Sequence, residues 1–274
     1  MSLGPGCGLL VVGHGTADPT GAAETRAVAA AVAEAVPGMA VELGFLEVIG
    51  PTVAEALGRL AARGCREVVA APLLLFAAGH AKRDVPEAIA TAAAALRITV
   101  CQADPLGLHP ALVALSRRRR HEAVAGLEQV AAEATLLLVV GRGSSDPEAL
   151  PQLRRFAEAT LVDAAAPRAS RVRFGFAAAA RPTLAEAIAA AADPALAGLR
   201  RIVVQPHLLF HGHVEEQVTE AVGRGRALRP DLEWIQAGRL GADPAVVTAL
   251  LARAGVPDSP GESLSRQGSD ESSQ

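Results

Sequence analysis

Cysteine is scarce in this sequence, with 3 among 274 residues. Cys7, Cys65 and Cys101 lie far apart and form no C-x-x-C pair. An odd number of widely separated cysteines excludes a disulfide framework, and it also excludes a cysteine cage for zinc or an iron–sulfur cluster. This cysteine usage is typical of proteins in a reducing compartment, and we therefore expect a cytoplasmic location.

Aromatic residues, excess charge and long apolar runs are also lacking. Aromatic residues make up 3% of the chain, with 0 Tyr and 1 Trp, so the sequence offers no aromatic platform for single-stranded nucleic acid. The net charge of −3 provides no basic surface for nucleic acid or an anionic membrane. There is no run of about 20 apolar residues and no basic segment followed by an apolar one. We expect no nucleic-acid partner, no membrane span and no export signal.

An internal repeat is the strongest feature that the sequence does have. The segment LLVVGHGTADP at residues 9–19 recurs as LLVVGRGSSDP at residues 137–147. Three further matches, which begin at Gly44, Pro72 and Leu106, recur in the same order in the second half. Ordered matches of this kind predict two copies of one architecture. We divide the chain into domains at 1–132 and 133–256, followed by an acidic Ser/Gly/Pro-rich tail at 257–274 that we expect to be disordered.

Each half alternates short β-branched or leucine-rich runs with long alanine-rich stretches. This alternation is typical of β-α-β units, whose parallel strands are covered by helices on both faces. We predict an α/β fold of two similar domains, each a small parallel sheet flanked by helices, with a cleft between them. The predicted strands are 8–12, 41–46, 67–75, 98–101, 136–140, 171–176, 202–206 and 233–236, and the predicted helices of the first half are 22–36, 52–63, 85–96 and 110–133.

The unusual polar residues of the first half follow its predicted strands. His14 comes after the first strand, Glu47 after the second and His80 after the third. Ligands of open parallel sheets bind beyond the carboxyl ends of the strands, so we expect these side chains to face one cleft. Glycines flank His14 and precede His80, which leaves both imidazoles accessible. Two imidazoles and a carboxylate suit metal binding or proton transfer.

The second half repeats the same strands and turns but has different side chains at these positions. Arg142 stands in place of His14, and Ala178 in place of Glu47. His80 is matched by His213 only if one residue is deleted. We therefore expect the second half to close the cleft and to bind substrate, with Arg142 and His213 as candidate contacts.

Two further clusters allow more than one interpretation. His207, His211 and His213 are a second metal site, substrate contacts or surface histidines. The run Arg117–Arg120 with His121 falls within a predicted helix. We interpret this run as a solvated face, because four arginines without aromatic neighbours are weak evidence for nucleic-acid binding.

Taken together, the motifs resemble those of a known family. GHGT at 13–16, GFLE at 44–47, PT at 51–52 and PLLLFAAGH at 72–80 resemble the signatures of sirohydrochlorin chelatases of the CbiX/SirB type, in their long, internally duplicated form. The resemblance implies insertion of Co²⁺ or Fe²⁺ into a tetrapyrrole on the way to cobalamin or sirohaem. By position it implies that His14 and His80 present the metal, that His14 also accepts protons and that Glu47 contacts the substrate. It further implies that Leu75, Phe76, Ala77, Ala78 and Gly79 lie against the macrocycle.

The residues agree with this chemistry. Metal insertion strips water from a divalent ion and removes two pyrrole protons, so it needs neutral imidazoles and a base. No cofactor is implied beyond the substrate metal. Two alternatives stay open: a metal or tetrapyrrole carrier without turnover, and a histidine-dependent phosphoryl transferase, although Gly13 stands where such an enzyme needs arginine. We expect a monomer, because the duplication supplies a two-domain cleft within one chain.

Overall fold

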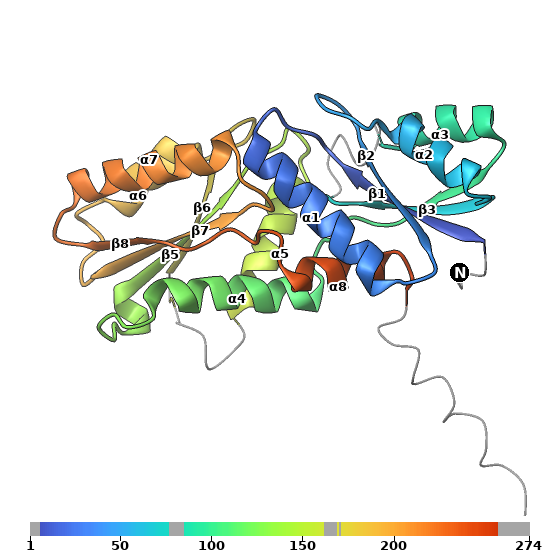
Figure 1. The fold of residues 1–274 in the computed structure, drawn as a ribbon. Helices are drawn as coiled ribbons and strands as arrows, with labels where there is room; N and C mark the ends of the chain where they lie inside the picture. The colour runs from blue at the N-terminus through green and yellow to red at the C-terminus, as the bar shows by residue number, and fades with distance from the viewer. Residues whose placement is uncertain (1–5, 77–84, 162–168, 170, 257–274) are drawn as a thin grey trace, which may run out of the picture.

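A computed structural model describes residues 6–76, 85–161, 169 and 171–256. It contains two parallel four-stranded sheets with strand orders β2-β1-β3-β4 and β6-β5-β7-β8 (Figure 1). The first half comprises β1 (Cys7–Gly13), α1 (Pro19–Ala35), β2 (Ala40–Phe45), α2 (Val53–Ala62), β3 (Glu67–Pro72), α3 (Val85–Leu96), β4 (Thr99–Gln102) and α4 (Pro110–Val124). The second comprises a short 3₁₀ segment (Ala132–Ala134), β5 (Thr135–Gly141), α5 (Ala149–Leu161), β6 (Arg171–Phe176), α6 (Leu184–Ala191), β7 (Arg201–His207), α7 (His213–Leu228), β8 (Glu233–Gln236) and α8 (Pro244–Arg253). The predicted fold class is confirmed.

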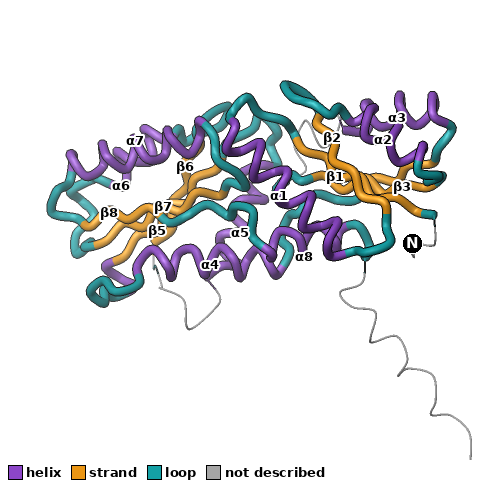
Figure 2. Tube along the Cα trace, viewed as in Figure 1, coloured by secondary structure: helices purple, strands orange, loops and turns teal. Residues whose placement is uncertain are grey.

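Both faces of each sheet are covered, and this explains the uninterrupted apolar strands. Successive side chains of a strand point to opposite faces. Leu10 and Val12 pack in one cluster with residues of α2 and α3, whereas Leu9 and Val11 pack in another with residues of α1 and α8. Figure 2 shows the two sheets with helices on both sides. No helix among the described residues is long and apolar enough to cross a membrane.

The last helix of each half covers the sheet of the other half. α4 ends the first repeat, yet it packs against α5 and against strands β7 and β8 of the second sheet. α8 ends the second repeat and packs against α1 and against β3 of the first sheet. In Figure 1, α4 runs along the second sheet, far from β1 and β2. The division near Ala132 therefore separates two sequence repeats whose cores are completed by exchanged helices.

The helix predicted over 110–133 is shorter than expected. α4 ends at Val124, because Ala125 has an extended backbone (φ −62°, ψ 131°) and Gly126 has φ +78°. Such a left-handed residue favours glycine and ends a helix. The strand predicted over 67–75 is also shorter and ends at Pro72, whose backbone has no N–H to donate to the ladder.

The interpretation of the arginine run of α4 as a solvated face holds for Arg118 and His121, which are exposed, and is wrong for Arg120. Arg120 is 1% exposed and donates hydrogen bonds to the Thr160 carbonyl at 2.8 Å and to Gln205 Oε1 at 3.2 Å. Arg117 donates to the carbonyls of Ala159 and Thr160. Burial, with a smaller effect of the neighbouring Arg117 charge, lowers the pKa of Arg120 to about 10. The guanidinium thus remains charged at neutral pH, and the run attaches α4 to the second half.

We predict that Arg120→Ala lowers the free energy of unfolding by roughly 3 kcal/mol, because it leaves buried acceptors without donors and opens a cavity. Arg118→Ala is the matched control on the same helix. Arg118 is half exposed and forms an ion pair with Asp243, so we expect a loss below about 1 kcal/mol. Urea denaturation measures both values, and equal losses would show that Arg120 does not hold the halves together.

Candidate active site

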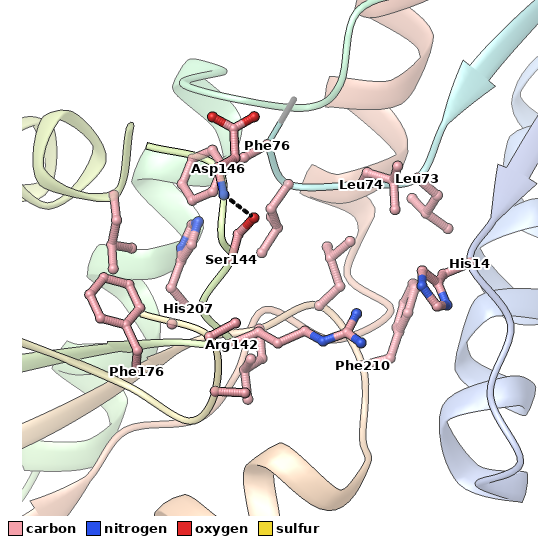
Figure 3. A pocket seen from close by; sticks show the side chains of 18 of the residues that line it. His14, Leu73, Leu74, Phe76, Arg142, Ser144, Asp146, Phe176, His207 and Phe210 are labelled. Carbon is pink, nitrogen blue, oxygen red and sulfur yellow. Dashed lines mark hydrogen bonds between the residues drawn. The ribbon is translucent and has the colours of Figure 1, made fainter. Parts of the chain in front are cut away.

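A cavity of about 1100 Å³ lies between the two halves. It is formed by the segments that follow β1 and β3 of the first sheet and β5 and β7 of the second (Figure 3). This is the predicted cleft, because the carboxyl ends of the central strands of both sheets open into it. Its polar side chains are those of His14, Thr16, Thr25, Arg142, Ser144, Ser145, Asp146, Glu148, His207 and His211.

His14 follows the last residue of β1 and lines the cavity. Its Nδ1 lies 3.2 Å from the Gly15 carbonyl oxygen and 3.4 Å from Glu47 Oε1. The His14 side chain is 21% exposed and that of Glu47 is 55% exposed. Both neighbours of Nδ1 are acceptors, so they favour the tautomer with the proton on Nδ1 and a lone pair on Nε2. A lone pair on Nε2 is what a divalent metal ion requires.

Gly15 makes the contact between His14 and Glu47 possible. Its φ is +98°, and a Cβ at this position would lie 1.9 Å from the Glu47 carbonyl oxygen. No other residue fits this turn without displacing the segment that carries Glu47. The Glu47 N–H in turn donates to the His14 carbonyl at 3.1 Å. The backbone thus fixes the two side chains beside each other.

The same turn recurs in the second half with different side chains. Gly143 has φ +91°, a Cβ there would lie 1.7 Å from the Ala178 carbonyl oxygen, and the Ala178 N–H donates to the Arg142 carbonyl at 2.9 Å. Arg142 and Ala178 therefore occupy the positions of His14 and Glu47, as the sequence predicted. Arg142 extends its guanidinium into the cavity (Figure 3). Among the described residues no carboxylate forms an ion pair with it.

The remaining candidates have different positions. Leu75 and Phe76 line the cavity, as expected for residues next to a substrate. Ala77, Ala78, Gly79 and His80 lie outside the described residues, so the predicted pairing of His14 with His80 stays a prediction. In the part of the chain that the structure describes, no group of three or more His, Cys, Asp or Glu side chains could hold a metal ion.

The three histidines of the second half are separated rather than clustered. His213 begins α7, its side chain is 78% exposed, and it lies near Glu216 and Gln217 away from the cavity wall. The one-residue deletion that aligned it with His80 therefore does not place it at the site. His207 ends β7 and is buried against the rings of Phe76 and Phe156. Burial lowers the pKa of His207 to about 3, so its imidazole is neutral.

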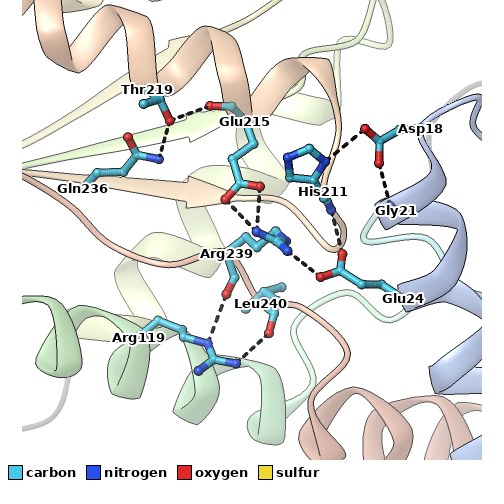
Figure 4. Close-up of polar contacts among 10 residues, drawn as sticks. All are labelled: Asp18, Gly21, Glu24, Arg119, His211, Glu215, Thr219, Gln236, Arg239 and Leu240. Atoms are coloured by element: carbon cyan, nitrogen blue, oxygen red, sulfur yellow. Dashed lines mark hydrogen bonds and ion pairs between the residues drawn. The ribbon is translucent and has the colours of Figure 1, made fainter.

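His211 belongs to a polar network that joins the two halves (Figure 4). Its Nδ1 lies 3.1 Å from Asp18 Oδ2, and its backbone N–H donates to Glu24 Oε2 at 2.8 Å. Arg239 forms an ion pair with Glu24. It forms a second ion pair with Glu215, at 2.7 Å. Asp18 and Glu24 belong to the start of α1, whereas the other three residues belong to the second half. This network could not be predicted from the sequence, because His211 and Asp18 are 193 positions apart.

Comparison with known proteins agrees with this geometry. The family model described as CbiX matches residues 8–123 and 136–255. The sirohydrochlorin cobaltochelatase of Priestia megaterium is 28% identical over 247 residues, which cover 90% of this chain and 78% of that protein. The sirohydrochlorin ferrochelatase of Bacillus subtilis (strain 168) is 26% identical over 246 residues, 89% of each chain. The structure of SirB from Bacillus subtilis with Fe³⁺ superposes with a TM-score of 0.77 at 25% identity, and covers 91% of this chain and 94% of that one.

The network around His211 predicts a pH dependence of stability. The hydrogen bond to Asp18 is the main cause that raises the pKa of His211 above 6.5. A raised folded-state pKa stabilises the protein below the unfolded pKa, and this stabilisation is lost as pH rises through the folded value. We expect the free energy of unfolding of the wild type to fall between about pH 6 and pH 8 relative to that of His211→Gln.

Asp18→Asn is the matched variant for this test, because asparagine still caps α1 while it removes the charge next to His211. It should flatten the pH dependence as His211→Gln does. Urea denaturation at a series of pH values measures the difference. Parallel curves for the wild type and both variants would contradict the assignment.

Proposed function

Because the chain belongs to the CbiX family, we propose that it is a sirohydrochlorin chelatase, which inserts Co²⁺ or Fe²⁺ into the tetrapyrrole. The observation that carries the proposal is His14, which lines a cavity of about 1100 Å³ and holds its Nδ1 beside the Glu47 carboxylate. Small-molecule sites usually enclose roughly 300–1,000 Å³, so this cavity suits a ligand as large as a macrocycle. The relatives named for both metals support the reaction class.

His14 acts as a ligand that presents the metal ion to the ring. Its Nδ1 proton faces the Gly15 carbonyl and the Glu47 carboxylate, which orients the imidazole and places the lone pair that binds the ion on Nε2. His80 is our proposed second imidazole, on the strength of its motif. Two imidazoles bind a divalent ion without the closed four-ligand cage of a structural site, so the ion can leave for the macrocycle.

Glu47 acts as the acceptor for the protons that the metal displaces. Insertion replaces two pyrrole N–H protons by one divalent ion, so two protons have to leave the ring. The Glu47 carboxylate is 55% exposed and is in contact with His14, so a proton received at this pair can pass to solvent. The first half thus supplies both the metal ligand and the base.

The second half adds a charged contact to the macrocycle, whereas apolar side chains of both halves line the cavity. Apolar side chains of the cavity, including Leu75, Phe76 and Phe210, suit the faces of a flat ring. Arg142 carries a charge into the same space, and a carboxylate arm of the tetrapyrrole is the natural partner of a guanidinium. We further propose that the enzyme works as a monomer, because one chain forms both walls of the cavity. We also propose that it works in the cytoplasm and without a resident cofactor.

We predict that His14→Ala lowers the rate of metal insertion roughly 100-fold or more while the fold persists, because the residue lies in a strand-end turn rather than in the core. Anaerobic incubation with sirohydrochlorin and each metal, followed by absorbance, measures the rate. His121→Ala on the outer part of α4 is the control. A near-native rate in His14→Ala would rule out the proposed role, and wild-type binding without turnover would identify a carrier.

Glu47→Gln separates proton transfer from metal binding. Glutamine keeps an acceptor near His14 Nδ1 but is a poor base, so insertion should slow while metal affinity changes little. Titration with Co²⁺ in the absence of tetrapyrrole measures that affinity. If the affinity falls and the rate at saturating metal does not, Glu47 is a metal ligand instead.

Arg142→Ala should raise KM for sirohydrochlorin about tenfold with little change in kcat, because it removes a contact made equally in the ground and transition states. Arg63→Ala is the control, since Arg63 follows the last residue of α2 and is half exposed. An unchanged KM would place Arg142 in solvent. A collapse of kcat would mean that the second half takes part in the chemistry.

A further inference from the structure

His207 is a buried imidazole on the wall of the cavity that the reaction described above leaves unused. The residue is 4% exposed, and its Nε2 has no hydrogen-bond partner among the described residues. Its ring lies against Phe76, with centroids 4.9 Å apart, and against Phe156, with centroids 4.1 Å apart. A buried donor or acceptor without a partner destabilises the folded protein, so such a group is worth explaining.

The repeat shows that the fold does not need a histidine at this position. Pro206 pairs with Val140 in the second sheet as Pro72 pairs with Val12 in the first. The residue after each proline is His207 in the second half and Leu73 in the first, and both line the cavity. Leucine therefore satisfies the same strand end in the first half, and the histidine has a reason other than packing.

The surroundings of His207 indicate the kind of group it meets. In Figure 3 it lies at the opposite side of the cavity from His14, with Arg142 between them. A macrocycle whose centre receives a metal ion from His14 turns its rim toward this wall. The rim of sirohydrochlorin carries carboxylate arms, and Arg142 brings the positive charge that such an arm requires.

We propose that His207 is a positioning residue that donates a hydrogen bond from Nε2 to a carboxylate arm of the tetrapyrrole, on the wall that carries Arg142. The proposal rests on the proposed chelatase function and extends it to the recognition of substrate. The imidazole is neutral, because burial lowers the pKa of His207 to about 3. It therefore adds a directed hydrogen bond next to the charge of Arg142.

Access to Nε2 requires a movement of one covering ring. Phe156 is 1% exposed and belongs to the core, whereas Phe76 is partly exposed and lines the cavity. Phe76 is therefore the ring that turns aside when the macrocycle enters. This places a residue of the first half and a residue of the second half on the same substrate edge.

The test compares His207→Leu, which imports the residue of the first half, with His207→Gln, which retains an N–H donor. Four quantities are measured: Kd for metal-free sirohydrochlorin by absorbance titration, KM and kcat for Co²⁺ insertion, and Tm. We expect His207→Leu to raise Kd and KM about tenfold, to change kcat less than twofold, and to leave Tm equal or higher. His207→Gln should restore Kd to within about threefold of the wild type. His121→Gln is the control.

The outcomes separate this proposal from the proposed function. A wild type that binds sirohydrochlorin but inserts no metal contradicts the chelatase function, while the Kd values still decide the role of His207. An unchanged Kd in His207→Leu, a loss confined to kcat, or no rescue by glutamine overturns the role of His207. Failure of His207→Leu to fold also overturns it, because the proposal requires the histidine to be dispensable for stability.

Discussion

The carbonyl oxygen of Glu47 occupies the space where any residue other than glycine at position 15 would place its Cβ. This close approach brings the segment after β2 onto the turn after β1. The position of His14 beside Glu47 follows from it. The same approach occurs between Ala178 and Gly143. The duplicated fold therefore has two equivalent turns that can carry functional side chains. The first half uses its position for an imidazole and a carboxylate, and the second for a guanidinium.

Because the last helices are exchanged, the two halves are held together, with the imidazole of one and the guanidinium of the other at the same cavity. The end of α4 packs in the core of the second sheet, and α8 packs with the start of α4 in the core beside the first, so each sheet is partly covered by the last helix of the other half. Arg120 holds α4 in place from within the core. The contacts of His211 and Arg239 with α1 connect the halves again at the edge of the cavity. The two walls of the cavity are therefore held by the same contacts that hold the fold together.

Much of the fold could be predicted from the sequence, because apolar runs and the repeat are local signals. The bounds of α3, β6 and β8 match the prediction, and the end of α4 differs where Gly126 interrupts the alanine-rich pattern. The turn that carries His14 and its equivalence with Arg142 could also be predicted, since both depend on short motifs.

What could not be predicted depends on contacts between distant segments. A run of arginines looks solvated unless the acceptors near it are known, and those of Arg120 lie on α5 and β7. The prediction that His213 contacts the cavity was wrong. An alignment that needs a one-residue deletion does not show which way the side chain points. His207 was grouped with its histidine neighbours, although its place at the end of β7 buries it against two aromatic rings.

Metal binding directly tests the division of roles in which the first half presents the metal and the second half holds the carboxylate arms of the macrocycle. Equilibrium dialysis of the purified chain against Co²⁺ under anaerobic conditions, without tetrapyrrole, counts the ions bound per chain. We expect one ion per chain in the wild type and in Arg142→Ala, and none in His14→Ala at the same metal concentration. Two ions per chain, or an ion retained by His14→Ala and lost by Arg142→Ala, would contradict the division between the halves.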